Sequence, residues 1–241
     1  MRVIDAFWDT RNLGIPCLEI VFDDDDAELS LPALAQLLDG YSYIAAKVPV
    51  DKHRIMQALQ EGGFTFVECS INMWHDLISI GNERTEEMSL RMSHELVTDC
   101  KDTSYILQRV SDGLFTSDRI YLDPRFTHEL ASKRYVSWLL DEMQRGACLF
   151  DVLFDGEKAG FFSYKEPEEG VSYPFLIGLY PEFRGKGLGA SLIVESLLAS
   201  RQRGCHLSST YVSSNNIPVI KAHEAIGSRI NNMHYVFVKH V

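Results

Sequence analysis

The sequence predicts a mixed α/β fold. Apolar residues alternate with a period of two in some segments and recur with the helical period in others, and the two kinds of segment follow one another along the 241 residues. The composition agrees, since 46% of residues are hydrophobic and 24% are charged, as is usual for a folded globular protein. A chain of this length can bury a sizeable core without disulfides. Disorder, collagen and a coiled coil are therefore excluded.

The first part of the chain is expected to alternate strand and helix. Pro32 falls in the first turn of one expected helix and Gly40 follows its end, while Asp51 is placed to cap the next helix. The four acids at 23–26 indicate a solvated loop rather than a metal site. The expected strands are 17–22, 43–50 and 64–72, and the expected helices are 31–38 and 51–60.

Residues 78–103 are polar and rich in charge, and we interpret them as a connector. A domain boundary is placed near residue 100, which separates a smaller N-terminal α/β domain (1–100) from a second domain (101–241). The Asp155-Gly156 pair between two apolar runs predicts a hairpin. In the second domain we expect turns or short helices at 115–126, strands at 105–110, 149–154, 159–164, 171–180, 206–212 and 233–241, and helices at 130–144, 188–202 and 217–225.

Charge and cysteine usage limit the class of partner. The net charge of −11 repels phosphate backbones, so no nucleic acid is expected, and an anionic ligand would need a local pocket of donors. The five cysteines stand singly with no CxxC pair, so neither a zinc site nor a disulfide framework is indicated. The start has no signal-peptide pattern, and no apolar run is long enough to span a bilayer. We expect a cytoplasmic protein with no membrane partner and no metal.

The most informative stretch follows the expected strand at 171–180. A turn containing Gly185, Gly187 and Gly189 leads directly into a helix. Glycines permit positive φ, and successive N–H groups at a helix N-terminus form an anion site. Arg184 and Lys186 add two cations in an acidic protein. The pattern predicts a cradle for a pyrophosphate.

Two common phosphate loops do not match this cradle. A Walker loop requires GxxxxGK[ST], and a dinucleotide fingerprint requires GxGxxG followed by an acid about twenty residues later. The spacing here is R-G-x-G-x-G, and residues 203–212 hold no acid. Instead, this pattern after a strand and Pro181 resembles the loop with which the GCN5-related N-acetyltransferase (GNAT) family holds the pyrophosphate of acetyl-CoA. The alternative is a glycine-rich turn of purely structural purpose.

The resemblance extends from about residue 105 to the C-terminus. Asn216, His223 and Gly227 occupy positions where the family has an Asn, an aromatic residue on a short helix, and a Gly. It implies a mostly antiparallel central sheet flanked by helices. The stretches 118–126 and 134–138 look like the branch that acetylates the amino sugar of a dTDP-linked 4-amino-4,6-dideoxyhexose (fucosamine), which also carries an N-terminal domain.

The resemblance also implies a set of site residues. Pantetheine would insert beside the strand at Ile177, Gly178 and Leu179, and the backbone near the middle of that strand would stabilise the oxyanion. His223 stands where the family commonly has a general-acid Tyr, and an imidazolium there could protonate the CoA thiolate. The remaining cofactor-binding residues implied are Arg184, Gly185, Lys186, Gly187, Leu188 and Gly189 for the pyrophosphate, and Asn216 for the cofactor or its cysteamine arm.

These features predict an N-acetyltransferase that transfers acetyl from acetyl-CoA to a primary amine by direct attack. The expected acceptor is the amino group of a nucleotide-linked amino sugar, and a homodimer is possible from the family. Two alternatives stay open: a non-catalytic acyl-CoA-binding module, or an acetyltransferase that acts on another small amine or a peptide. Nothing in the sequence identifies the general base.

Overall fold

The computed structural model describes residues 1–80, 87 and 89–241, and in them the chain forms two compact units. Unit 1 comprises Met1–Ile71, Ser213–Asn215 and Asn232–Val241, and unit 2 comprises Asn72–Val212 and Asn216–Asn231. Seven helices and a large, mostly antiparallel sheet are described, which confirms the predicted mixed α/β class. The division into domains 1–100 and 101–241, with a boundary near residue 100, stays a prediction.

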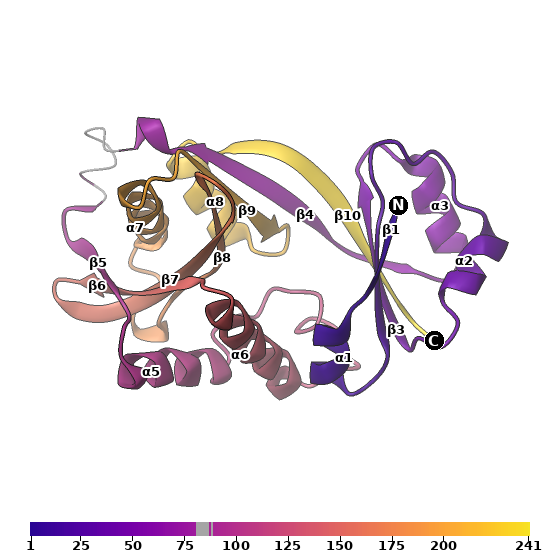
Figure 1. The fold of residues 1–241 in the computed structure, drawn as a ribbon, viewed down its shortest axis with the longest axis horizontal. Coiled ribbons are helices and arrows are strands. Elements are labelled where there is room, and N and C mark those ends of the chain that lie inside the picture. The colour runs from indigo at the N-terminus through magenta and orange to yellow at the C-terminus, as the bar shows by residue number, and fades with distance from the viewer. Residues whose placement is uncertain (81–86, 88) are drawn as a thin grey trace. The chain divides into compact units, whose positions relative to one another are not determined.

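Unit 1 covers its sheet with short helices (Figure 1). Its core contains Leu34 of α2, Ile55 and Leu59 of α3, and residues of the strands such as Ile20 and Phe237. β2 pairs with β1 in antiparallel and with β3 in parallel orientation, and β10 pairs with β3 in antiparallel orientation. The elements are β1 (Arg2–Asp5), α1 (Phe7–Leu13), β2 (Cys17–Val21), α2 (Leu31–Leu37), β3 (Tyr43–Pro49), α3 (His53–Glu61), the first part of β4 (Thr65–Asp76) and the last part of β10 (Arg229–His240).

Unit 2 is a sheet with helices on both faces. Its strands run in the order β9-β8-β7-β6-β5, and each pair is antiparallel except β8 with β9. Besides short 3-10 turns at Leu77–Ser79 and Pro181–Phe183, its elements are β5 (Met92–Leu96), α5 (Cys100–Ser111), α6 (His128–Gln144), β6 (Cys148–Phe154), β7 (Glu157–Glu168), β8 (Val171–Leu179), α7 (Gly189–Gln202), β9 (Leu207–Ser213) and α8 (Ile217–Ala225).

The two faces of this sheet follow from strand alternation. Phe161 of β7 packs with residues of α5 and α6, whereas its neighbour Phe162 packs in the cluster of Leu192 on α7. Successive side chains of a strand point to opposite faces, so β7 is apolar on both. This explains why the run 159–164 is almost continuously hydrophobic, and it places α7 opposite the α5–α6 pair (Figure 1).

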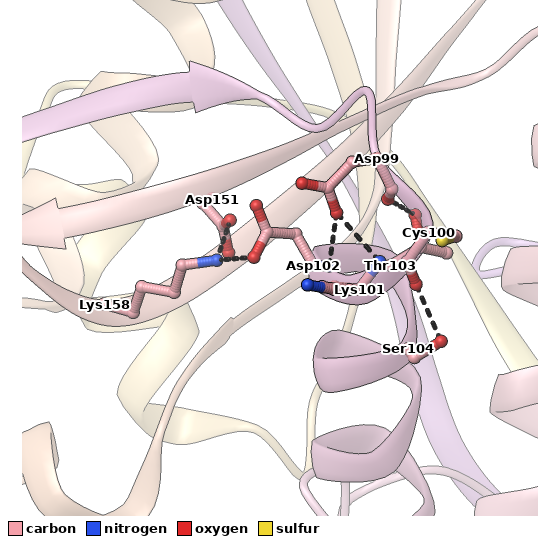
Figure 2. Close-up of polar contacts among 8 residues, drawn as sticks. All are labelled: Asp99, Cys100, Lys101, Asp102, Thr103, Ser104, Asp151 and Lys158. Atoms are coloured by element: carbon pink, nitrogen blue, oxygen red, sulfur yellow. Dashed lines mark hydrogen bonds and ion pairs between the residues drawn. The ribbon is translucent and has the colours of Figure 1, made fainter.

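The strand predicted at 105–110 is wrong, because these residues lie in α5. Asp99 caps this helix, and its carboxylate accepts hydrogen bonds from the backbone N–H groups of Lys101 and Asp102, each at 2.8 Å. Figure 2 shows these bonds at the helix start. Ile106 and Val110 are buried four residues apart, which is the spacing of one helix face. Asp99 lies in the stretch that was interpreted as a connector, so the sequence was not taken to predict a helix here.

Lys158 ties α5 to the hairpin of β6 and β7 (Figure 2). Its ammonium lies 2.6 Å from the carboxylate of Asp151 on β6 and also binds Asp102 on the first turn of α5. Asp151 is only 3% exposed, and burial raises the pKa of its carboxyl group. A buried carboxylate needs such a partner, because desolvation strongly disfavours an isolated charge.

Other differences concern element ends and short elements. α3 begins at His53 after Lys52, so the expected cap at Asp51 is wrong. β1, α1 and β5 were not predicted, and β5 lies within the presumed connector, whose residues 81–86 and 88 fall outside the described residues. β10 begins at Arg229, four residues before the expected start at 233. The missed elements have only 4, 7 and 5 residues, too few for a clear periodicity.

Replacing Lys158 with Met should destabilise the protein by about 3–5 kcal/mol, since it leaves the Asp151 carboxylate buried without its cation. Urea unfolding at neutral pH measures this loss, and it should shrink at low pH as Asp151 takes up a proton. Arg91→Met is the matched control, because Arg91 pairs with Asp155 in the turn of the same hairpin but this pair is exposed and should contribute far less to stability. Equal losses in the two variants would contradict the role of Lys158.

Candidate active site

The glycine loop joins β8 to α7 and exposes its backbone. Gly185 and Gly187 have φ of +75° and +77°, and a Cβ at either position would meet no atom within 4 Å. Leu188 occupies the N-cap of α7 and provides no side-chain hydrogen bond. Among the described residues, no acceptor is found for the N–H groups of Gly185 and Gly187. Open donors at the start of a 14-residue helix are suited to an anion.

The two cationic side chains of this loop make contacts of their own. The Arg184 guanidinium donates to the backbone oxygen of Leu114 at 2.6 Å and to that of Leu179 at 3.3 Å. The Lys186 ammonium lies 4.7 Å from the centre of the Phe183 ring. Arg184 thus fastens the loop to the segment before α6, and the phosphate-binding role expected of both side chains stays a prediction.

β8 and β9 pair at one end only. Their parallel ladder contains Val171 with Leu207 and Ser172 with Ser208, after which the Thr210 hydroxyl donates to the backbone oxygen of Pro174 at 2.6 Å. Pro174 has no N–H with which to continue a ladder, and β8 also carries a bulge against β7 at this point. The remainder of β8 therefore has an edge that β9 does not pair.

The backbone of Ile177 and Leu179 faces this unpaired edge. The Tyr180 N–H donates to the Ala159 oxygen of β7 at 2.8 Å, so the alternation of an antiparallel ladder turns residues 178 and 180 toward β7. The polar groups of residues 177 and 179 then point to the other side, where an extended chain could add as a strand. This is the edge at which the sequence placed pantetheine, and the binding of pantetheine there stays a prediction.

Two glycines bring β7, β8 and the segment before α6 close together. A Cβ on Gly160 would lie 2.4 Å from the oxygen of Gly178, and a Cβ on Gly178 would lie 2.8 Å from the Leu114 side chain. Gly178 therefore serves the packing of β8 as well as its expected place in the cofactor site.

α8 brings His223 close to the start of α7. A Cβ on Gly189 would lie 3.6 Å from the Cβ of Ala222, the residue before His223. His223 is 5% exposed, and burial, with a smaller effect of His75, lowers its pKa to about 4. The ring is therefore neutral at neutral pH, and the imidazolium expected from the sequence is disfavoured because the site excludes water. A role for the neutral ring stays a prediction.

Ser228 contacts two histidines. Its hydroxyl oxygen lies 3.0 Å from Nδ1 of His223 and 3.3 Å from Nδ1 of His75 on β4. Neither His75 nor Ser228 was among the site residues predicted from the sequence. The available signal was Ser228 itself, a hydroxyl in the residue that follows the Gly227 turn.

Asn216 is the N-cap of α8. Its side-chain oxygen accepts from the N–H of Val219 at 3.4 Å, and Gly227 follows the helix with a φ of +78°. The Asn and Gly of the predicted block thus begin and end the helix that carries His223. Contact of Asn216 with the cofactor stays a prediction.

Comparison with known proteins agrees with this geometry. Residues 116–227 match the family model for the acetyltransferase (GNAT) family. A mycothiol acetyltransferase from Corynebacterium glutamicum is 32% identical over 116 residues, which cover 47% of this chain and 37% of that protein. A mycothiol acetyltransferase from Corynebacterium efficiens is 32% identical over 92 residues, covering 37% of this chain and 31% of that protein. The chain thus matches only about a third of the length of these relatives.

Solved structures show the same fold. A GCN5-related N-acetyltransferase from Sphaerobacter thermophilus superposes with a TM-score of 0.62 at 14% identity, covering 82% of this chain and 59% of that one. One from Kribbella flavida gives a TM-score of 0.61 at 12% identity, covering 93% and 81%.

Residues 116–227 are therefore similar to the GNAT family of acetyltransferases, a family that uses acetyl-CoA as cosubstrate. The relatives found carry the name mycothiol acetyltransferase and do not point to the amino-sugar branch that the sequence suggested. Within the described residues, no group of three or more metal-ligating side chains comes together, and no helix has the length and apolar character of a membrane span.

Gly187→Ala should weaken acetyl-CoA binding at least tenfold, because a methyl group would stand where the backbone must approach a diphosphate. Isothermal titration calorimetry measures the affinity. Gly14→Ala is the matched control, since Gly14 at the end of α1 has a φ of +72° and an equally open surrounding. The two variants should lose similar stability, and a similar loss of binding in both would contradict the cradle.

Lowering the pH should reduce stability through His223. Its folded pKa of about 4 lies below the ordinary histidine pKa of 6.5, so the unfolded chain binds more protons between these two pH values. The contribution is complete above pH 6.5 and is lost as the pH falls toward 4, by roughly 2–3 kcal/mol between pH 7 and 4.5. Urea unfolding of the wild type and His223→Gln at both pH values should show a smaller decrease in the variant. An equal decrease would show that the imidazole is not held neutral.

Proposed function

We propose that this chain is an acetyl-CoA-dependent N-acetyltransferase that acetylates a primary amine by direct attack. The observation that carries the proposal is the unpaired edge of β8 beyond Pro174, which ends at the open amides of the glycine loop. An edge that can pair with an extended, amide-bearing arm and a cradle that can hold a diphosphate match the two halves of coenzyme A. Both lie in the region that matches the GNAT family.

The proposed parts follow from this placement. The N–H groups of residues 185–189 would bind the pyrophosphate, with the N-terminus of α7 contributing its partial positive charge. The backbone groups of Ile177 and Leu179 would pair with the pantetheine arm. A backbone donor near the middle of β8 would stabilise the oxyanion that forms when the amine attacks the thioester carbonyl. Positioning of the two substrates would supply much of the rate.

His223 is proposed as the group that protonates the departing thiolate. A neutral imidazole keeps one N–H, but this group is a far weaker acid than a thiol, so His223 can give up its Nε2 proton only if Nδ1 takes up another proton in the same step. Its neighbour Ala222 touches the first residue of α7, which supports a place beside the loop.

The acceptor amine is the less defined half of the reaction. The stretches 118–126 and 134–138 suggest the amino group of a nucleotide-linked amino sugar. The relatives instead carry the name mycothiol acetyltransferase. The amine that those enzymes acetylate is therefore the second candidate acceptor for this chain. A cytoplasmic protein, possibly a homodimer, without a nucleic-acid partner is also part of the proposal, and the net charge of −11 supports the last point.

The test is release of free thiol from acetyl-CoA in the presence of an amine panel. The panel contains dTDP-linked amino sugars, the amine that mycothiol acetyltransferases acetylate, polyamines and peptides, and released CoA is measured by chromatography so that a thiol on the acceptor does not interfere. Turnover with one class identifies the acceptor. Tight binding of acetyl-CoA without turnover on any amine would favour the alternative of a non-catalytic acyl-CoA-binding module, and the absence of binding would reject both functions.

His223→Phe should lower turnover at least about a hundredfold with acetyl-CoA affinity within a few-fold of the wild type, because the ring volume stays while the N–H is lost. Steady-state rates and calorimetry on the same preparation separate the two effects. Unchanged turnover would remove His223 from the mechanism, and loss of binding would indicate a structural role.

A further inference from the structure

His75, Ser228 and His223 form a closed polar cluster in unit 2, and it deepens the function proposed above. One hydroxyl oxygen lies within 3.3 Å of the Nδ1 atoms of both rings. The backbone N–H of Ser228 donates to the His223 oxygen at 3.0 Å, which keeps the hydroxyl beside that ring. Among the described residues, neither Nε2 atom has a hydrogen-bond partner.

Both rings are held neutral. His75 is 9% and His223 5% exposed, and burial lowers the pKa of each. Besides burial, His75 lowers the pKa of His223, and Asp76 next to His75 opposes the lowering of the His75 pKa. A neutral imidazole has one N–H and one lone pair, so each ring must choose a tautomer.

The Ser228 hydroxyl has one proton and two lone pairs, so it can donate to only one of the two rings. When it donates to Nδ1 of one ring, its oxygen accepts from the Nδ1–H of the other. The first ring then carries its proton on Nε2, and the second presents a lone pair at Nε2. This arrangement gives one ring that can donate a proton at Nε2 and one that can receive a proton there, whereas an oxygen that accepts from both Nδ1–H groups would give both rings the same tautomer.

We propose that His75, Ser228 and His223 form a proton relay in which the two tautomers exchange as one proton enters at Nε2 of His75 and another leaves from Nε2 of His223. The step balances. The acetylated nitrogen loses its proton to His75, whose Nδ1 proton passes to the Ser228 oxygen, while the Ser228 proton passes to Nδ1 of His223. The His223 Nε2 proton goes to the thiolate, and every protein group ends neutral. His75 is thus the catalytic base that the sequence did not identify, and Ser228 is a positioning residue that acts through the two rings.

The first arm of the test needs no turnover. Nitrogen-15 NMR of histidine-labelled protein should show one Nδ1–H and one Nε2–H tautomer for His75 and His223, and Ser228→Ala should abolish this opposition. The same tautomer on both rings of the wild type would overturn the relay and leave the proposed acetyl transfer intact.

The second arm uses turnover. Ser228→Ala and His75→Gln should each lower kcat at least tenfold with KM for acetyl-CoA within threefold, and Ser228→Thr, which restores a hydroxyl, should recover most of the rate. When several protons move in one step, kcat depends on the deuterium content of the solvent along a curve. In Ser228→Ala this dependence should become linear. The control is Ser196→Ala, which removes a buried hydroxyl bound to a backbone oxygen in α7 and should change neither quantity.

The outcomes separate the relay from the proposed function. Should Ser228→Ala fail to fold, by circular dichroism and urea unfolding, His75→Gln with the Thr variant provides the same comparison. Unchanged kcat in the folded variants, or equal effects in Ser196→Ala, would overturn the relay. A wild-type chain that acetylates no amine would overturn the proposed function and the relay together, whatever the tautomers.

Discussion

The parting of β8 from β9 is the constraint on which the candidate site depends. A strand inside a sheet has both edges paired, and it offers nothing to a ligand. Here the ladder stops after Ser172 because Pro174 has no N–H and a bulge redirects the strand. The Thr210 hydroxyl fixes the point of separation by its bond to the Pro174 oxygen. Beyond it, β8 has an edge that β9 does not pair, and the Leu179 oxygen on this edge accepts a hydrogen bond from Arg184.

The surrounding structure keeps that edge rigid and places the helix N-terminus at its end. On one face, Leu114 and Phe115 lie against Gly178, and Arg184 binds the Leu114 oxygen. On the other face, α7 is held by apolar packing and by Glu195, a buried carboxylate that contacts His94 of β5 at 2.6 Å. Since the pairing raises the pKa of His94, the contact is strongest with the imidazole charged. The glycine loop can therefore be exposed, because Arg184 holds its start and the packing of α7 holds its end.

The sequence predicted the fold class and the helices on either side of the glycine turn and His223 better than it predicted the short elements and α5. The glycine turn, the helix after it and the Asn-helix-Gly block around His223 have distinctive residue types at fixed spacing, and each element was found. The α5 segment failed because Tyr105 and Ile106 favour a strand locally, while Asp99, which caps the helix, lay in a stretch read as connector. Propensity is a weak guide when a cap and tertiary packing decide the outcome.

Other features depend on contacts between residues far apart in the chain, and no local pattern contains them. His75 and Ser228 are separated by 153 positions, and Lys158 reaches Asp102 across 56. The break in the β8 ladder did have a local signal, since a proline inside an apolar strand argues against a paired central position. Pro174 was visible in the sequence, but its meaning required knowing which strand lay beside it.

The hydroxyl shared by His75 and His223 has a kinetic consequence for an enzyme that uses it. Each passage of a proton leaves the two rings with their tautomers exchanged and the total charge unchanged. The free enzyme after product release is thus an isomer of the one that bound substrate, and solvent must restore it before the next cycle. Such a protein follows an iso mechanism, in which regeneration of the catalyst is itself a step that can limit the rate.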